Sequence, residues 1–212
     1  MDDAALTFDT SRALGRDVIL ITCFHPISPE SLTPGERERY AAFSHPRRRE
    51  DWLRGRGALK SLLRKLALSD DTSRLSFPHP RVSLSHAAGV ALAAGLGGEP
   101  ADGIGVDFEG PRPMRPGTER FYLAAEEREA LWSAGEPPPD RLLRLWTIKE
   151  ALFKADLGNR GASLAEYRLE NPESACGRAM RVSPEAPPRL FRYRSAEFCG
   201  GHLSVALRAD TK

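Results

Sequence analysis

Three acidic residues and one lysine carry the clearest potential for chemistry in this chain. Asp107 and Glu109 stand two residues apart at the end of an apolar segment, and this spacing puts both carboxylates on one face of a strand. A hard cation such as Mg²⁺ would relieve their mutual repulsion, because it binds one or two carboxylates and takes substrate phosphate oxygens as further ligands. Taken alone, however, the pair is better explained as two surface acids at a solvated strand end.

Glu150 and Lys154 lie four residues apart in the segment 140–157 (DRLLRLWTIKEALFKADL). This spacing puts them on one helix face, where an exposed pair would contribute only about 0.2–0.5 kcal/mol. The segment is apolar around most of its circumference, which is typical of a buried helix. A buried charged pair needs partners, because burying it unpaired is costly. A metal ion and a phosphate would supply them, and an ordinary surface pair remains the alternative.

Two further features favour phosphate binding. Ser85 and His86 follow an apolar strand and precede a glycine-containing turn. A hydroxyl and an imidazole bind phosphate oxygens, although a turn histidine without a ligand is the ordinary explanation. Residues 36–65 contain ten Lys and Arg residues against four acids. Such a cluster binds phosphates or an acidic partner, whereas simple solvation is the commonest explanation of a basic helix face.

The elements that must position these residues form an α+β pattern. Strands are predicted at 17–24, 81–96 (two strands around a turn at 87–89), 102–109, 162–170, 189–195 and 201–208. Helices are predicted at 33–43, 46–68, 124–133 and 140–157. Both halves run from a helical segment into strands, and residues 89–96 (GVALAAGL) faintly resemble 202–207 (HLSVAL). We therefore expect two similar lobes with the site between them.

Composition narrows the class of protein. The net charge is only +2, so the chain as a whole is no polycation. Cys23, Cys176 and Cys199 are far apart, which argues against a disulfide framework or a cysteine zinc site and favours a reducing compartment. The chain shows neither a secretory signal nor an apolar run of about 18 residues. We expect a soluble, cytoplasmic protein.

Several motifs, in this order, resemble those of the 4′-phosphopantetheinyl transferase superfamily, specifically its surfactin-synthetase-activating type. Ser83-Leu84-Ser85-His86 resembles the family's Ser-x-Ser-His, Gly105-Val106-Asp107-Phe108-Glu109 its Gly-[Ile/Val]-Asp-[Ile/Val]-Glu, and residues 146–154 (WTIKEALFK) its Trp-[Ser/Thr]-x-Lys-Glu-[Ala/Ser]-x-x-Lys. Arg120-Phe121-Tyr122 followed by Glu126 resembles the family's Arg-Phe-Phe segment with its helix-opening Glu, and Arg56-Gly57-Ala58-Leu59-Lys60 resembles its basic helix.

The resemblance implies a fold and a reaction. The fold would be α+β with two pseudo-symmetric lobes: residues 1–105 binding coenzyme A and the carrier, and residues 106–212 holding the metal and catalytic residues. The reaction would move 4′-phosphopantetheine from coenzyme A to a serine of an apo acyl, peptidyl or aryl carrier domain, releasing 3′,5′-ADP. The protein would be a monomer that needs neither nucleic acid nor a membrane.

The resemblance also assigns roles to residues. Asp107, Glu109 and Glu150 would surround Mg²⁺ on the pyrophosphate, and Glu150 would be the general base. Lys154 would neutralise the pyrophosphate or protonate the leaving group. His86, with Ser85 beside it, would bind a coenzyme A phosphate, most suitably the 3′-phosphate. Further phosphate charge would fall to Lys60, Arg56 or Arg49.

One departure and three alternatives stay open at this point. The family's Gly-Lys-Pro segment is replaced here by residues 74–81 (RLSFPHPR), where Arg74 or Arg81 would have to replace the lysine that contacts coenzyme A. A degenerate member with weak activity is therefore one alternative. The others are a nucleic-acid-binding module built on the arginine-rich helix and a domain with a purely structural metal. The nucleic-acid-binding module explains the residues less well because its acids would repel phosphate. The structural metal domain explains them less well because acids with a nearby lysine resemble an open site.

Overall fold

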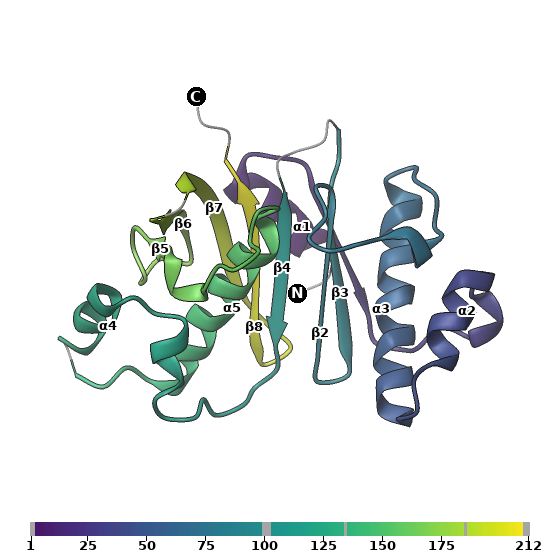
Figure 1. Ribbon diagram of the computed structural model, residues 1–212, viewed down its shortest axis with the longest axis horizontal. Coiled ribbons are helices and arrows are strands. Elements are labelled where there is room, and N and C mark those ends of the chain that lie inside the picture. The colour runs from purple at the N-terminus through teal and green to yellow at the C-terminus, as the bar shows by residue number, and fades with distance from the viewer. Residues whose placement is uncertain (1–2, 99–102, 134, 185, 210–212) are drawn as a thin grey trace.

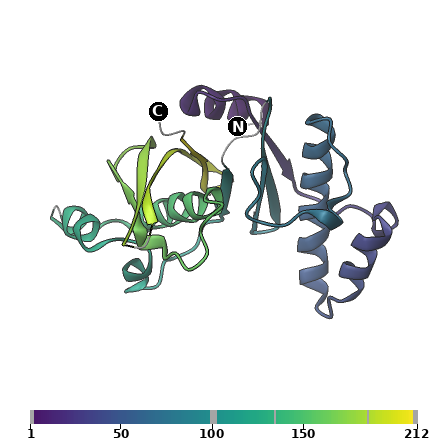
Figure 2. The same cartoon turned by 45° about the horizontal axis from the view of Figure 1, so that its top comes forward.

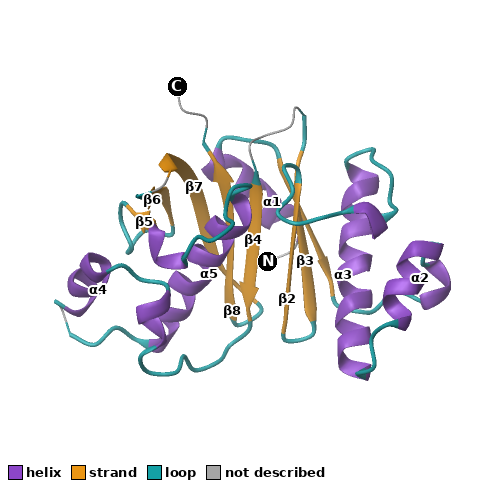
Figure 3. Ribbon diagram, viewed as in Figure 1, coloured by secondary structure: helices purple, strands orange, loops and turns teal. Residues whose placement is uncertain are grey.

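The computed structural model describes residues 3–98, 103–133, 135–184 and 186–209, and it arranges them as helices packed on two antiparallel sheets (Figures 1 and 3). The first sheet has the order β1-β3-β2, with β1 at Val18–Cys23, β2 at Val82–Ala87 and β3 at Val90–Leu96. The second has the order β4-β8-β7-β6-β5, with β4 at Ile104–Glu109, β5 at Tyr167–Leu169, β6 at Cys176–Ser183, β7 at Ala186–Phe198 and β8 at Gly201–Arg208. The predicted α+β class is confirmed.

Four helices lie where the sequence predicts them: α2 at Pro34–Ala41, α3 at Pro46–Lys65, α4 at Ala125–Trp132 and α5 at Pro139–Ala155. Thr33 caps α2, since its side chain accepts a hydrogen bond from the Glu36 amide. Helix α3 packs on the first sheet through Leu59 and Leu62, and α5 packs on the second through Ile148. No helix among the described residues has both the length and the apolar character needed to span a membrane.

Helix α1, at Asp3–Leu14, was not predicted from the sequence. It buries Leu6 and Leu14 in a core shared by both sheets, and Figure 2 shows it lying across strands of each. Its polar residues, spaced every fourth position, accept hydrogen bonds from alternate backbone amides of the edge strand β1: Ser11 from Val18 at 3.0 Å, Thr7 from Leu20 at 3.1 Å and Asp3 from Thr22 at 3.0 Å. The helix therefore satisfies a sheet edge that would otherwise be open.

The predicted elements between α5 and β7 were partly wrong. Residues 164–166 form a 3₁₀ turn, only residues 167–169 form a strand, and β6 occupies the stretch 171–188 for which no element was predicted. Along β6 the inward positions alternate between Ala179 and Arg181, while Met180 faces outward. A buried arginine and an exposed methionine disguise the apolar–polar alternation that identifies a strand.

The two halves of the chain repeat one plan. In each, an edge strand (β1 or β4) leads to a short helix, a long helix and a hairpin whose last strand pairs with the edge strand. The faintly similar segments 89–96 and 202–207 lie in the corresponding strands β3 and β8. Strand β6 and its short partner β5 are additions of the second half. This order supports the expected pseudo-symmetry.

A buried ion pair recurs at the same place in each half. Glu36 on α2 pairs with Lys60 on α3 at 2.9 Å, and Glu127 on α4 pairs with Lys149 on α5 at 2.6 Å. Each glutamate also accepts a hydrogen bond from the amide of the residue before its own helix, Thr33 for Glu36 and Ala124 for Glu127. Each lysine also donates to a backbone carbonyl, that of Asp70 for Lys60 and that of Tyr167 for Lys149. These pairs fix the short helix to the long helix in both lobes.

Serine side chains join the two sheets where β2 meets β4. Ser83 Oγ accepts the amide of Val106 at 3.0 Å, and Ser85 Oγ accepts the amide of Phe108 at 3.1 Å. The Ser-x-Ser spacing therefore matches the two-residue period of the neighbouring strand. It holds the end of β2 beside the acidic end of β4.

Candidate functional site

Gly105 brings α5 against β4. A Cβ atom at this position would lie 1.9 Å from the carbonyl oxygen of Ala151, far inside van der Waals contact. The helix backbone therefore lies directly on the strand two residues before Asp107. As a result Lys154 Nζ reaches Asp107 Oδ1 at 2.6 Å and the carbonyl of Val106 at 3.2 Å.

Asp107 is 5% exposed, and its two carboxylate oxygens differ. Oδ1 accepts hydrogen bonds from Lys154 and, at 2.9 Å, from Ser85. Oδ2 is buried and has no partner within the described part of the chain. Burial raises the pKa of Asp107, although Lys154 and Ser85 oppose this. A cation beside Oδ2 would satisfy the orphan oxygen.

Glu109 lies at the mouth of the site, where two side chains contact it. Arg112 forms a bidentate pair with its carboxylate, with both nitrogen–oxygen distances at 3.1 Å. Trp146 Nε1 donates to Glu109 Oε1, also at 3.1 Å. Glu109 is therefore held by the loop that follows β4 and by α5 together.

Glu150 is half-buried and forms neither a hydrogen bond nor an ion pair among the described residues. Burial raises its pKa, and the negative charge of Asp107 raises it further. A carboxylate without a hydrogen-bond partner is free to accept a proton from a ligand in the hollow.

These side chains line one hollow of about 430 Å³, and a second hollow of about 440 Å³ adjoins it. The first is lined by Leu84, Ser85, His86, Asp107, Phe108, Glu109, Trp146, Glu150 and Lys154. The second shares Leu84, His86 and Lys154 with it and adds Arg56, Phe77, Pro78, Ser83, Phe153 and Asn159. His86 is exposed and faces both. Together they form a groove with carboxylates at one end and cationic groups along it, which suits a phosphorylated ligand.

The donor set matches a hard divalent cation in its chemistry. Asp107, Glu109 and Glu150 offer only oxygen ligands, and the unpartnered Oδ2 of Asp107 lies among them. Their side chains do not form a ready cage: no three His, Cys, Asp or Glu residues in the described ranges are arranged as a metal site. Arg112, which pairs with Glu109, would compete with a cation for that carboxylate.

The structure places the remaining predicted phosphate ligands at different depths. Arg56 lines the second hollow, donates to Thr72 Oγ1 at 3.1 Å and lies over the Trp52 ring. Lys60 is 5% exposed and its charge is already paired with Glu36. Arg49 donates to the Phe43 carbonyl and lines neither hollow. Of the three, only Arg56 borders the groove.

Sequence reasoning missed three residues that shape the site. Arg112 and Trp146 hold Glu109, and Lys149 is fully buried against Glu127. Glu126, which the motif comparison singled out, is instead an exposed partner of Arg168. The sequence did contain a signal that Glu127 matters for the fold: it stands at the third position of α4, where a glutamate can accept the amide of the residue before the helix.

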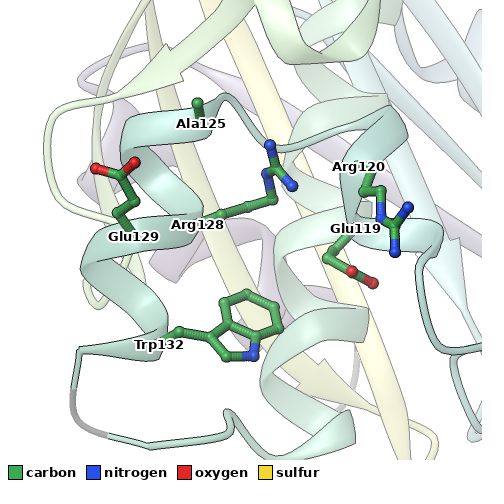
Figure 4. A pocket seen from close by; sticks show the side chains of 6 residues that line it. All are labelled: Glu119, Arg120, Ala125, Arg128, Glu129 and Trp132. Atoms are coloured by element: carbon green, nitrogen blue, oxygen red, sulfur yellow. The ribbon is translucent and has the colours of Figure 1, made fainter.

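A separate hollow of about 470 Å³ lies on α4, away from these carboxylates. Figure 4 shows Arg128 and Trp132 from α4 facing Glu119 and Arg120 from the preceding turn. It contains none of the predicted site residues. Its four charged groups balance each other, so the hollow has no electrostatic preference.

Comparison with known proteins adds one match. No curated protein matches the chain. A family model does match the part of the chain that contains β4, α5 and the three carboxylates Asp107, Glu109 and Glu150. Residues 103–195, a little under half of the chain, match the 4′-phosphopantetheinyl transferase superfamily.

Proposed function

We propose that this protein transfers the 4′-phosphopantetheine group of coenzyme A to a serine of an apo carrier protein, in the manner of the surfactin-synthetase-activating type. One observation carries the proposal. Three motifs that lie far apart in sequence contribute Ser85 and His86, Asp107 and Glu109, and Glu150 and Lys154 to a single hollow. The match over residues 103–195 supports the same reaction class.

The residues have complementary roles in this reaction. Glu150 accepts the proton of the carrier serine hydroxyl, because its carboxylate lines the hollow and forms no hydrogen bond or ion pair among the described residues. The serine oxygen then forms a bond to the β-phosphorus, and the bond from that phosphorus to the bridging oxygen breaks. Lys154, fixed by Asp107, places a positive charge beside the departing 3′,5′-ADP. His86 and Arg56 bind other phosphates along the groove.

Asp107, Glu109 and Glu150 would hold Mg²⁺. When bound, this ion would supply charge neutralisation on the pyrophosphate. Ser85 contributes indirectly, because its hydroxyl hydrogen bonds to both Asp107 and the Phe108 amide and so fixes the strand end. It positions Asp107 and His86 and need not contact the ligand itself.

We further propose a division of labour between the lobes. Residues 1–105 would bind coenzyme A and the carrier, and residues 106–212 would provide the metal and catalytic groups. The exposed arginines at the start of α3, including Arg48, form a basic rim that would attract an acidic carrier domain. The protein would act as a cytoplasmic monomer.

The test is the mass of a purified apo carrier after incubation with the protein, coenzyme A and Mg²⁺. A gain of one phosphopantetheine establishes transfer. Glu150→Gln and Asp107→Asn should abolish the gain, since each preserves side-chain shape while removing the charge. Arg160→Gln, which changes an exposed arginine outside both hollows, is the matched control and should leave the transfer intact.

Failure to modify acyl, peptidyl and aryl carriers would contradict the proposal. Coenzyme A binding, measured by calorimetry, separates the explanations of such a failure. Binding without transfer would indicate a degenerate member, for which the missing Gly-Lys-Pro segment is the natural cause. Absence of binding would remove coenzyme A from the proposal altogether.

A further inference from the structure

One face of the second sheet is only half covered. Helix α1 packs against β7 and β8 on the side opposite α5, and most of β6 extends beyond it. Ala179, Phe191 and Tyr193 face inward toward α5, so the residues between them in sequence face outward on the other side. Met180 and Leu190 are 37% and 38% exposed there. This open face has no role in the proposed transfer.

Two arginines stand opposite each other on this face. Arg178 of β6 and Arg192 of β7 are cross-strand partners in register, and both are exposed. Partners of this kind have Cβ atoms about 4.5–5.5 Å apart, and like charges in such a pair destabilise the sheet. Within the described residues neither side chain forms a hydrogen bond or an ion pair. The fold therefore places two unneutralised cations side by side.

The arginines border a hollow of about 450 Å³ between the end of α1 and the strands β7 and β8. It is lined by Leu14, Gly15, Arg16, Glu170, Arg178, Leu190, Phe191, Arg192, Leu207, Arg208 and Ala209. Four of these residues are arginines. Glu170 is the one acid in the lining, and it pairs with no cation among the residues that the structure describes. The hollow is thus cationic at its rim where Arg178 and Arg192 lie, and the exposed Leu190 adds an apolar surface beside them.

The C-terminal end of α1 compensates the positive charge of only one of the two arginines. A guanidinium nitrogen of Arg192 lies 3.4 Å from where a Cβ of Gly15 would stand, close to the last carbonyls of the helix. Helix C-termini carry partial negative charge and attract cations. This contact accounts for Arg192 but leaves Arg178, directly opposite, without compensation.

We propose that this hollow binds a small phosphorylated molecule with an apolar portion. Its phosphate would lie between Arg178 and Arg192, because guanidinium groups match phosphate oxygens in geometry as well as charge. Its apolar portion would contact Leu190, which is exposed at the hollow. The site lies on the face of the sheet away from α5 and is separate from the groove that contains Asp107.

The test is calorimetric titration of the full chain at low ionic strength with three probes: hexyl phosphate, inorganic phosphate and hexanol. We expect hexyl phosphate to bind most tightly, inorganic phosphate more weakly and hexanol not at all. Arg178→Gln and Arg192→Gln should each weaken hexyl phosphate about tenfold or more, as expected for loss of a charge-assisted hydrogen bond. Arg12→Gln, which changes an exposed arginine of α1 outside the hollow, should leave it unchanged.

A second readout does not depend on the ligand. Without phosphate, Arg178→Gln should raise the melting temperature by about 1–3 °C, because it removes the like-charge pair.

No binding of hexyl phosphate, or an equal loss in Arg12→Gln, would overturn the proposal. Tight binding of a DNA duplex that depends on both arginines, without hexyl phosphate binding, would overturn it in favour of a nucleic-acid surface. Unaltered carrier modification in both variants would show the site to be separate from the transfer.

Discussion

Replacing Lys149 with methionine should mainly destabilise the fold, whereas replacing Lys154 with methionine should mainly reduce carrier modification. Lys149 is fully buried, and its ammonium lies 2.7 and 2.6 Å from the two carboxylate oxygens of Glu127 and also contacts the Tyr167 carbonyl. Methionine at this position keeps most of the volume but leaves Glu127 buried without its cation. Breaking a buried pair in this way costs about 3–5 kcal/mol. That is a large share of the roughly 5–15 kcal/mol expected for a folded domain.

Lys154→Met should reverse the balance of effects. Lys154 borders an open hollow and its side chain is 29% exposed, so water from the hollow can take the place of its ammonium, and Asp107 Oδ1 keeps the hydrogen bond from Ser85. The cost in unfolding free energy should be smaller than for Lys149→Met, about 1–3 kcal/mol, as for a buried group that loses one hydrogen-bond partner. Carrier modification, in contrast, should fall about 100-fold or more, because the cation beside the leaving group is lost.

The assay is urea unfolding at pH 7, followed by circular dichroism. Burial lowers the pKa of Lys149 to about 8, against the opposing charge of Glu127, so the lysine is still mainly protonated at this pH. Adding Glu127→Gln to Lys149→Met should recover part of the loss, because it removes the uncompensated charge. A Lys149→Met protein within about 1 kcal/mol of the wild type, or losses that simply add in the double variant, would refute the reasoning.

Three further outcomes follow from the site and its supports. Gly105→Ala should cost about 1–3 kcal/mol in urea unfolding, since its Cβ would meet the α5 backbone, and an unchanged midpoint would contradict that packing. Burial raises the pKa of Asp156, but hydrogen bonds from Gly158, Arg181, Tyr167 and Arg189 outweigh it and lower the pKa overall. Its contribution is therefore complete above the ordinary carboxyl pKa and disappears as the pH falls through the lowered value. Asp156→Asn should accordingly lose about 3–5 kcal/mol at pH 7, and this loss should shrink progressively as the pH falls below the ordinary carboxyl pKa toward the lowered value. Arg112→Gln should bind Mn²⁺ about two- to fivefold more tightly in calorimetry, because Arg112 competes for Glu109; equal or weaker binding would contradict this.

Local sequence patterns were sufficient to predict the helices that have a capping box or a regular apolar face. The Thr33 capping box and the apolar spacing of α5 predicted helices that the structure contains. Helix α1 was missed because its buried stripe of Leu6, Thr10 and Leu14 includes a threonine, while the apolar Phe8 is exposed. Its signal was the polar spacing of Asp3, Thr7 and Ser11, which has meaning only beside β1.

Long-range pairing was the part of the site that the sequence did not reveal. The partner of Lys60 is Glu36, 24 positions earlier, and a basic motif gives no hint that its lysine is already neutralised. Likewise Glu126 and Glu127 are adjacent, yet they face different directions around α4, so only the second reaches Lys149. The motifs pointed to Asp107, Glu109 and Glu150, which the structure brings to one hollow, but the surroundings of these carboxylates depend on contacts between segments far apart in the chain.

The internal repeat explains why only one lobe contains the carboxylates. If Lys60 and Lys149 are equivalent, then Ser61 occupies the place of Glu150 in the first lobe. In the first lobe the strand pairing likewise puts Ile21 at the position equivalent to Asp107, because Ile21 pairs with β3 as Asp107 pairs with β8.

The difference lies in what covers each edge strand. Helix α1 satisfies the amides of β1 with its polar side chains and covers that edge, whereas the serines of β2 satisfy the amides of β4 and leave its end open beside His86. A buried carboxylate in the first lobe would have neither water nor a cation within reach. The repeat can therefore support chemistry only at the junction of β2 and β4, where a strand rather than a helix completes the edge.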